Sequence, residues 1–102
     1  MQTGNLGGKL AFTVAWETKP GNEDAARAIV ERFAPLARAE DGLEVLVVSQ
    51  NAANPRQFLF FEVFRDAAAF EAHQQTAHFR TMILEDALPL LAHRERVEYR
   101  TL

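Results

Sequence analysis

The segment FLFFEVFRDAAAFEAHQQTAHFR, residues 58–80, decides how the chain folds. Its first part reads as a strand that is apolar on both faces, with Phe58, Phe60, Glu62 and Phe64 on one side and Leu59, Phe61 and Val63 on the other. Such a strand is expected to be covered on both sides. Its second part predicts a short helix capped by Asp66 and, after Thr76, another helix from Ala77 to about Leu88.

The sequence on either side predicts three more strands and one long helix. Residues 9–18 alternate apolar and small side chains, residues 43–50 are apolar apart from Glu44, and residues 96–100 form a short last strand. An apolar stripe recurs at helical spacing from residue 25 to residue 37, after a possible cap at Asn22. Pro35 is expected to kink that helix or to cut it short.

The resulting order, β-α-β-β-α-α-β, predicts an α+β fold of the ferredoxin-like, split βαβ type. Four antiparallel strands carry helices on one face, and residues 9–102 form a single domain. Residues 1–8 are expected to be a disordered tail or an expression remnant. The second face of the sheet is still largely apolar, which predicts a homodimer.

Composition excludes several classes of function. The net charge is −3 and basic residues are dispersed, so we expect no nucleic-acid partner. The chain has no cysteine, which excludes disulfides, zinc–thiolate sites and a thiol nucleophile. We expect no membrane span, because no run of roughly 18 apolar residues occurs. The start, MQTGNLGGKL, lacks the apolar core of a signal peptide, so we expect a cytoplasmic protein.

From RDAAAFEAHQQTAHFR outward, nearly the whole chain resembles the antibiotic biosynthesis monooxygenase family. The resemblance lies in an aromatic strand with a Glu, an acidic turn, Phe-x-x-His, and a Thr before x-His-Phe, which here are Glu62, Asp66, Phe70, His73, Thr76, His78 and Phe79. It implies a dimeric α+β barrel with a pocket between sheet and helices in each protomer. His73 stands where the haem-degrading branch places a Trp, so haem degradation is not expected.

Glu62 and His73 are the first candidate catalytic residues. A carboxylate among phenylalanines must be paired, hydrogen-bonded or protonated. Glu62 is therefore either ion-paired with Arg94 or Arg96, or an acid–base group that orients a histidine. His73 shares a helix face with Phe70 and is either a pocket histidine bonded to Glu62 or a half-buried one bonded to a backbone carbonyl.

His78 is the third candidate, in the first turn of its helix, where the helix dipole favours a neutral imidazole that can act as a base. The alternative is a surface histidine beside Phe79. His93 is expected at the surface. No metal site is expected, since His73 and His78 are five residues apart across a helix break rather than on one helix face.

The resemblance implies a cofactor-independent monooxygenase that oxidises a quinol or anthrone-like small aromatic molecule with O₂, and no cofactor is expected. The alternatives are a small-molecule isomerase or signal-processing enzyme of the same fold, and a non-enzymatic, stress-associated dimer that binds a ligand. Leu46 and Val48 replace aromatic residues that relatives often carry, so substrate identity does not carry over. Aromatic side chains expected to contact the substrate are Phe12, Trp16, Phe60, Phe64, Phe70 and Phe79.

Overall fold

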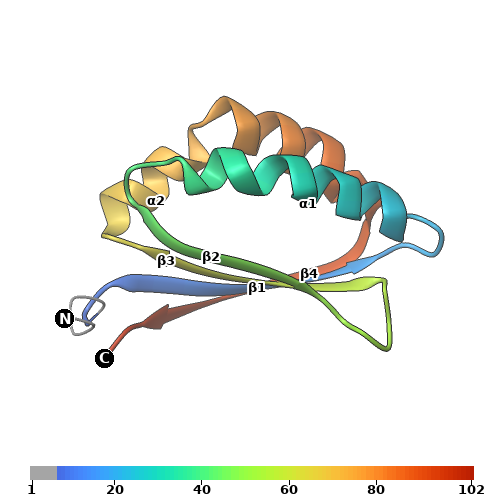
Figure 1. The fold of residues 1–102 in the computed structure, drawn as a ribbon, viewed down its shortest axis with the longest axis horizontal. Helices are drawn as coiled ribbons and strands as arrows, with labels where there is room; N and C mark the ends of the chain where they lie inside the picture. The colour runs from blue at the N-terminus through green and yellow to red at the C-terminus, as the bar shows by residue number, and fades with distance from the viewer. Residues whose placement is uncertain (1–6) are drawn as a thin grey trace.

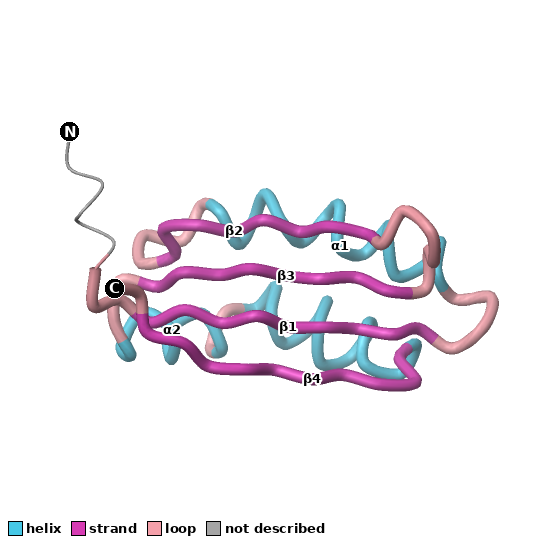
Figure 2. Tube along the Cα trace, turned by 90° about the horizontal axis from the view of Figure 1, so that it is seen from below, coloured by secondary structure: helices cyan, strands magenta, loops and turns pink. Residues whose placement is uncertain are grey.

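The computed structural model describes residues 7–102 as a four-stranded antiparallel sheet with all its helices on one face (Figure 1). The elements are β1 (Leu10–Thr18), α1 (Glu23–Arg38), β2 (Leu43–Gln50), β3 (Gln57–Phe64), α2 (Ala67–Gln74), the π-helix η2 (Phe79–Ala87), the 3₁₀-helix η3 (Leu88–Leu90) and β4 (Leu91–Arg100). The strand order is β2-β3-β1-β4 (Figure 2), which confirms the ferredoxin-like prediction. The tail expected over residues 1–8 lies outside the described residues except for Gly7 and Gly8.

The central strands β1 and β3 hold the core, because their alternating side chains pair across the sheet. Trp16 lies opposite Phe58, Val14 opposite Phe60 and Phe12 opposite Glu62, and all these residues are buried under the helices. Directly paired residues point to the same face of an antiparallel sheet. The helix-facing side of β1 and β3 is therefore an aromatic surface in which β3 places one acid, Glu62.

Helix α1 buries the predicted apolar stripe and extends past Pro35 to Arg38, so the expected early end at Pro35 was wrong. Proline removes one N–H, whose acceptor would have been the Glu31 carbonyl. Both residues lie on the exposed face of the helix, where water can replace the lost bond. Asn22 precedes the helix as expected, but its side chain makes no capping bond.

The two helix caps in the deciding segment form through their side chains. The Asp66 carboxylate accepts a hydrogen bond from Ala69 N at 2.8 Å, and the Thr76 hydroxyl accepts one from Phe79 N at 3.1 Å. The helix after Thr76 is π-helical over Phe79–Ala87 rather than purely α-helical. The spacing of apolar residues over nine positions does not distinguish an α-helix from a π-helix, so the sequence could not predict this difference.

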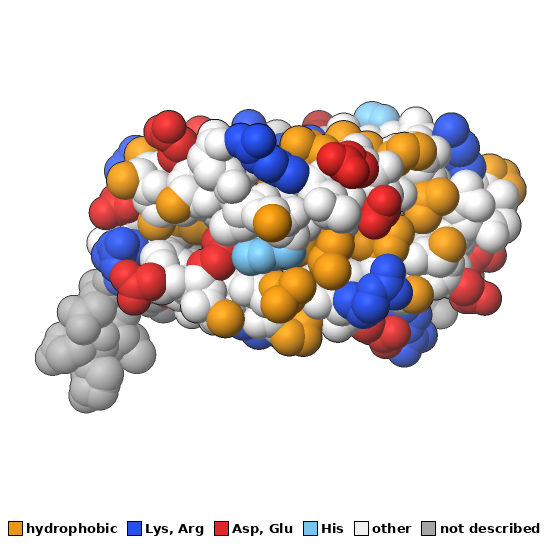
Figure 3. All heavy atoms as spheres, turned by 90° about the horizontal axis from the view of Figure 1, so that it is seen from above, with side chains coloured by type: hydrophobic (Ala, Val, Ile, Leu, Met, Phe, Trp, Pro, Cys, Tyr) orange, Lys and Arg blue, Asp and Glu red, His pale blue; other side chains and the backbone are white. Residues whose placement is uncertain are grey.

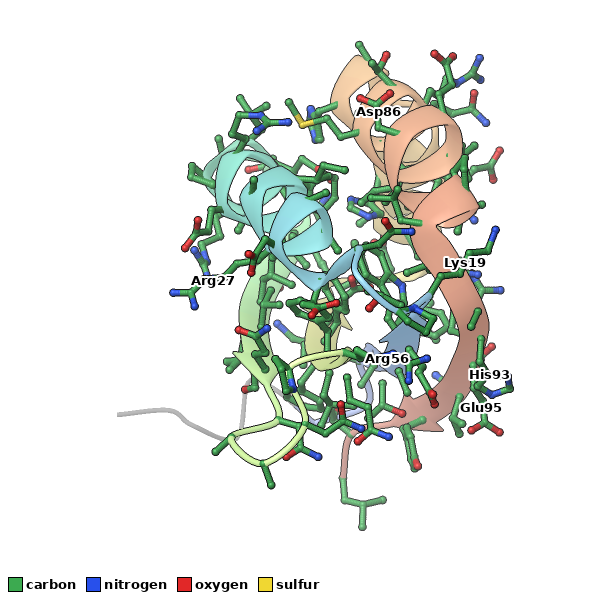
Figure 4. All side chains as sticks on the ribbon, turned by 90° about the vertical axis from the view of Figure 1, so that its right-hand side faces the viewer. Lys19, Arg27, Arg56, Asp86, His93 and Glu95 are labelled. Atoms are coloured by element: carbon green, nitrogen blue, oxygen red, sulfur yellow. The ribbon has the colours of Figure 1, made fainter. Side chains whose placement is uncertain are left out.

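Strand β4 begins at Leu91, five residues before the expected start at Arg96. Residues 91–95 lack clear alternation, but they pair with the far half of β1, from Ala15 to Thr18. The partner strand therefore extends β4 beyond its own sequence signal. His93 lies within β4 and is exposed, as expected of a surface residue, and Figure 4 shows it beside Glu95 at the outside of the strand.

The second face of the sheet remains uncovered in the single chain. Its exposed apolar residues are Val47, Leu59, Phe61, Val97 and Tyr99. Register places Val47, Phe61 and Val97 in one row across the sheet, with Thr13 between the last two. We call this the open sheet face.

Candidate functional site

A small cavity lies between the sheet and the helices. Its volume is about 30 Å³, which holds one or two water molecules. Two half-buried rings of the helix layer, Phe70 and Phe79, form part of its wall. The complete lining is Val14, Trp16, Phe33, Phe60, Glu62, Phe70, His73, Phe79, Ile83, Arg94 and Arg96.

Glu62 stands on the sheet side of this cavity with only 7% of its surface exposed. Burial raises the pKa of its carboxyl from 4.5 to about 7, with a smaller push from Glu40, although the positive charges of Arg94 and Arg96 oppose the shift. Among the described residues it accepts no hydrogen bond and forms no ion pair within 4 Å. The proposed pair with Arg94 or Arg96 is not formed, because β1 separates β3 from β4.

His73 and His78 both bind Glu40, a residue that follows α1. His73 Nδ1 lies 2.8 Å from Glu40 Oε1, and His78 Nε2 lies 2.6 Å from Glu40 Oε2. The expected bond between His73 and Glu62 is therefore not made. The structure instead brings the two histidines together on one carboxylate, the Glu40 bridge.

The Glu40 bridge fixes which nitrogen of His73 is available. A carboxylate only accepts hydrogen bonds, so Nδ1 of His73 carries the proton that it donates to Glu40. Burial lowers the pKa of His73, although the bond to Glu40 and its charge oppose this shift. The lowered pKa favours a neutral imidazole ring. His73 also lines the cavity while Glu40 does not, so Nε2, with its lone pair, is the nitrogen free to meet a ligand.

His78 lies on the side of the Glu40 bridge that faces away from the cavity. It is partly buried and does not line the cavity, although its ring packs edge-on against Phe33 at 5.7 Å between centroids. Its contact with anything in the cavity runs through Glu40 and His73.

Of the aromatic residues expected to contact a substrate, Trp16, Phe60, Phe70 and Phe79 line the cavity. Phe12 and Phe64 do not. Instead, both pack against Phe70, with ring centroids 4.4 Å and 5.3 Å away, and support it from the sheet side. The Trp16 indole N–H is buried and has no acceptor in residues 7–102.

Sequence reasoning missed Glu40, and it considered Arg94 and Arg96 only as ion-pair partners. Glu40 lies 33 residues from His73 and 38 from His78, so no local spacing links them. A buried and a partly buried imidazole do require polar partners, and the acidic pair Glu40–Asp41 was the nearest signal. Arg94 falls in the part of β4 that the sequence did not identify as strand, and Arg96 is the first residue of the strand that it did predict.

In residues 7–102, no three His, Cys, Asp or Glu side chains are arranged to hold a metal ion. No helix in the described part of the chain is long and apolar enough to cross a membrane. The side chains that can do chemistry in the cavity are thus a neutral histidine, a carboxyl group that titrates near pH 7, and two arginines.

Fold and cavity together define a ferredoxin-like α+β protein with an aromatic cavity that holds acid–base groups. The sequence profile of the family described as antibiotic biosynthesis monooxygenase matches residues 11–83. The chain belongs to this family, which suggests a monooxygenase-like function.

An uncharacterized protein of Synechocystis is 32% identical over 76 residues, which are 74% of this chain and 51% of that protein. The chain thus spans about half the length of this curated relative. A crystal structure of a Pseudomonas aeruginosa protein matches with a TM-score of 0.84 and 26% identity over 95% of this chain and 97% of the other. A Nitrosomonas europaea protein whose name refers to the same family matches with a TM-score of 0.87 and 23% identity, over 94% and 92% of the two chains.

Proposed function

We propose that the protein is a cofactor-independent monooxygenase that oxidises a quinol or anthrone-like aromatic molecule with O₂. The observation that carries the proposal is the pairing, in one aromatic cavity, of a neutral histidine held by Glu40 with a carboxyl group whose pKa is about 7. Family membership supports the same reaction type.

The reaction needs a base, a proton donor and a dry site. His73 Nε2 removes a proton from the substrate, and the resulting electron-rich anion passes one electron to O₂. The two radicals combine into a peroxide, which takes a proton from Glu62. Loss of the second C–H proton and cleavage of the O–O bond then release water. For an anthrone the balance is Ar₂CH₂ + O₂ → Ar₂C=O + H₂O.

The surrounding side chains serve this chemistry by position and by exclusion of water. Phe33, Phe60 and Phe79 give the cavity a low polarity, which strengthens the electrostatic effect of each charged group inside it. The cavity of about 30 Å³ accommodates O₂ but not an aromatic ring, so a substrate enters by displacing Phe70 and Phe79. His78 acts through Glu40 as a positioning residue.

We also propose that the working unit is a homodimer formed through the open sheet face. Hydrophobic side chains on the helical face are dispersed among charged ones (Figure 3). The open sheet face, by contrast, exposes Phe61 and Tyr99 by 40% and 51% along with three aliphatic residues. A contiguous apolar surface of this kind is typical of a protein–protein interface.

The test is O₂ uptake by chelator-treated protein with a panel of hydroquinones and anthrones, with the rate of autoxidation subtracted. We expect uptake above background that falls about 100-fold or more in His73→Ala and in Glu62→Gln, because general acid–base groups contribute roughly that much. Glu71→Gln, an exposed carboxylate on α2, is the matched control and should keep full activity.

If wild-type uptake equals autoxidation for every compound, the oxygenase proposal fails. Conversion of a compound without O₂ uptake would point to the isomerase alternative. Tight binding of an unchanged aromatic, insensitive to Glu62→Gln and His73→Ala, would identify a binding protein.

A further inference from the structure

Three side chains, Phe79, Arg94 and Arg96, line both the inner cavity and an outer cleft of about 580 Å³. The cleft is open to solvent and includes Arg80 and Glu85 on its rim. These three residues therefore stand at the mouth of the cavity, between η2 and β4. A ligand that entered by this route would pass between a ring on one side and two guanidinium groups on the other.

The two arginines at the mouth lack a fixed counter-charge. In residues 7–102, neither guanidinium forms a hydrogen bond or an ion pair, whereas those of Arg56 and Arg65 bind Glu17 and Asp41. The Arg96 guanidinium is stacked 5.2 Å from the ring centres of Phe12 and Phe70, which holds its plane in place.

Acidic groups near the mouth do not neutralise this pair. Glu62 is protonated in part at neutral pH, since burial raises its pKa to about 7. Glu85 lies on the cleft rim, and Glu98 follows two residues after Arg96 on β4, yet neither lies within 4 Å of either guanidinium. Burial and the like charge of Arg96 lower the pKa of Arg94, as expected for a cation without a close partner.

We propose that the ligand of this site is an aromatic acid, whose ring enters the cavity against Trp16 while its carboxylate stays at the mouth between Arg94 and Arg96. The planar fork of a guanidinium matches a carboxylate with two parallel hydrogen bonds. The chain carries a net charge of −3, so the positive mouth is a local feature. The inference deepens the proposed function, but it concerns binding and can be measured without turnover.

The test uses 2-naphthoate and its uncharged counterpart 2-naphthamide, with affinities from isothermal titration calorimetry. We expect the acid to bind at least about tenfold more tightly, the usual effect of hydrogen bonds to a charged group. Trp16 is the only tryptophan, so its single indole N–H resonance reports whether the ring enters the cavity. That resonance should shift with both compounds.

Arg94→Gln and Arg96→Gln should each reduce the preference for the acid and leave the affinity for the amide unchanged. Arg96→Lys keeps the charge without the fork and should give an intermediate preference. Arg32→Gln, an exposed arginine on α1, is the matched control. Both arginine positions are surface positions, and a dispersed amide spectrum establishes that each variant is folded.

Equal affinity for the two compounds would overturn the inference, as would a preference that survives both Arg→Gln changes together. Naphthoate binding without a shift of the Trp16 resonance would place the ring elsewhere and would also overturn it. If the acid binds as expected but no compound of the panel, dihydroxynaphthoic acids included, causes O₂ uptake above autoxidation, the oxygenase proposal fails and the ligand class stands. If uncharged quinols are oxidised while 2-naphthoate and 2-naphthamide bind equally, the aromatic-acid inference fails and the oxygenase proposal stands.

Discussion

Glu62 is the residue at which burial and chemistry conflict most directly. Register places it between Phe12 and Leu46 on the helix-facing side of the sheet, so its ionised form has lost most of its water. A raised pKa in the folded state means that the stability linked to this group is complete below pH 4.5 and is lost as the pH rises through about 7.

Glu62→Gln should therefore stabilise the protein at pH 8 relative to wild type and have little effect at pH 4.5. The difference at pH 8 is on the order of 3 kcal/mol, from a shift of the pKa between 4.5 and about 7. Urea denaturation at the two pH values measures it, with Glu71→Gln as control. An identical pH dependence for Glu62→Gln and wild type would contradict the burial argument.

Glu40 holds the tautomer of His73. In Glu40→Ala, the pKa of His73 should fall further, because the bond and charge of Glu40 are what raise it against burial. The Nδ1–H form should also give way to a mixture of tautomers. Long-range ¹H–¹⁵N spectra across a pH titration report both effects, and Asp41→Ala, at the next, exposed position, is the control. An unchanged His73 tautomer and pKa would show that Glu40 does not orient the ring.

At the scale of elements, Gly42 sets how closely α2 approaches the turn before β2. A Cβ at position 42 would lie 2.2 Å from Ala69 Cβ, whereas the Gly42 carbonyl accepts a bond from Arg65 N at 2.8 Å. The Ala69 methyl group cannot shift without moving α2, the helix that also carries His73.

Gly42→Ala should destabilise the fold by roughly 1–3 kcal/mol, as overpacking commonly does. The second change Ala69→Gly removes the clashing methyl group and should recover part of this loss in the double variant. Thermal denaturation of the two single variants and the double variant measures the coupling. If the losses of stability in the two single variants simply add in the double variant, the contact between residues 42 and 69 does not position α2.

The sequence predicted the fold well because strand and helix signals are local. Alternation in β1, the stripe of α1 and the side-chain caps at Asp66 and Thr76 each depend on residues a few positions apart. It predicted Glu62 and His73 as candidate acid–base residues because an ionisable side chain in an apolar segment is unusual. It did not predict that His73 binds Glu40, since the two residues are 33 positions apart and only the tertiary fold brings them together.

At the scale of the whole molecule, the open sheet face is the feature that a single chain leaves unexplained. Phe61→Glu places a charge in the middle row of that face and should convert the proposed dimer into a monomer. Sedimentation velocity gives the mass, and Leu84→Glu, an exposed leucine on the helical face, is the control. A wild type that sediments as a monomer at micromolar concentration would contradict the proposed dimer.

The proposed mechanism transfers one oxygen atom of O₂ to the aromatic substrate and reduces the other to water. The most direct measurement is turnover under ¹⁸O₂ of whichever panel compound supports uptake, with mass spectrometry of the product. The mechanism predicts one ¹⁸O atom per product molecule, one O₂ consumed per turnover and no hydrogen peroxide. An unlabelled product accompanied by stoichiometric hydrogen peroxide would contradict it, because the protein would then oxidise its substrate without inserting oxygen.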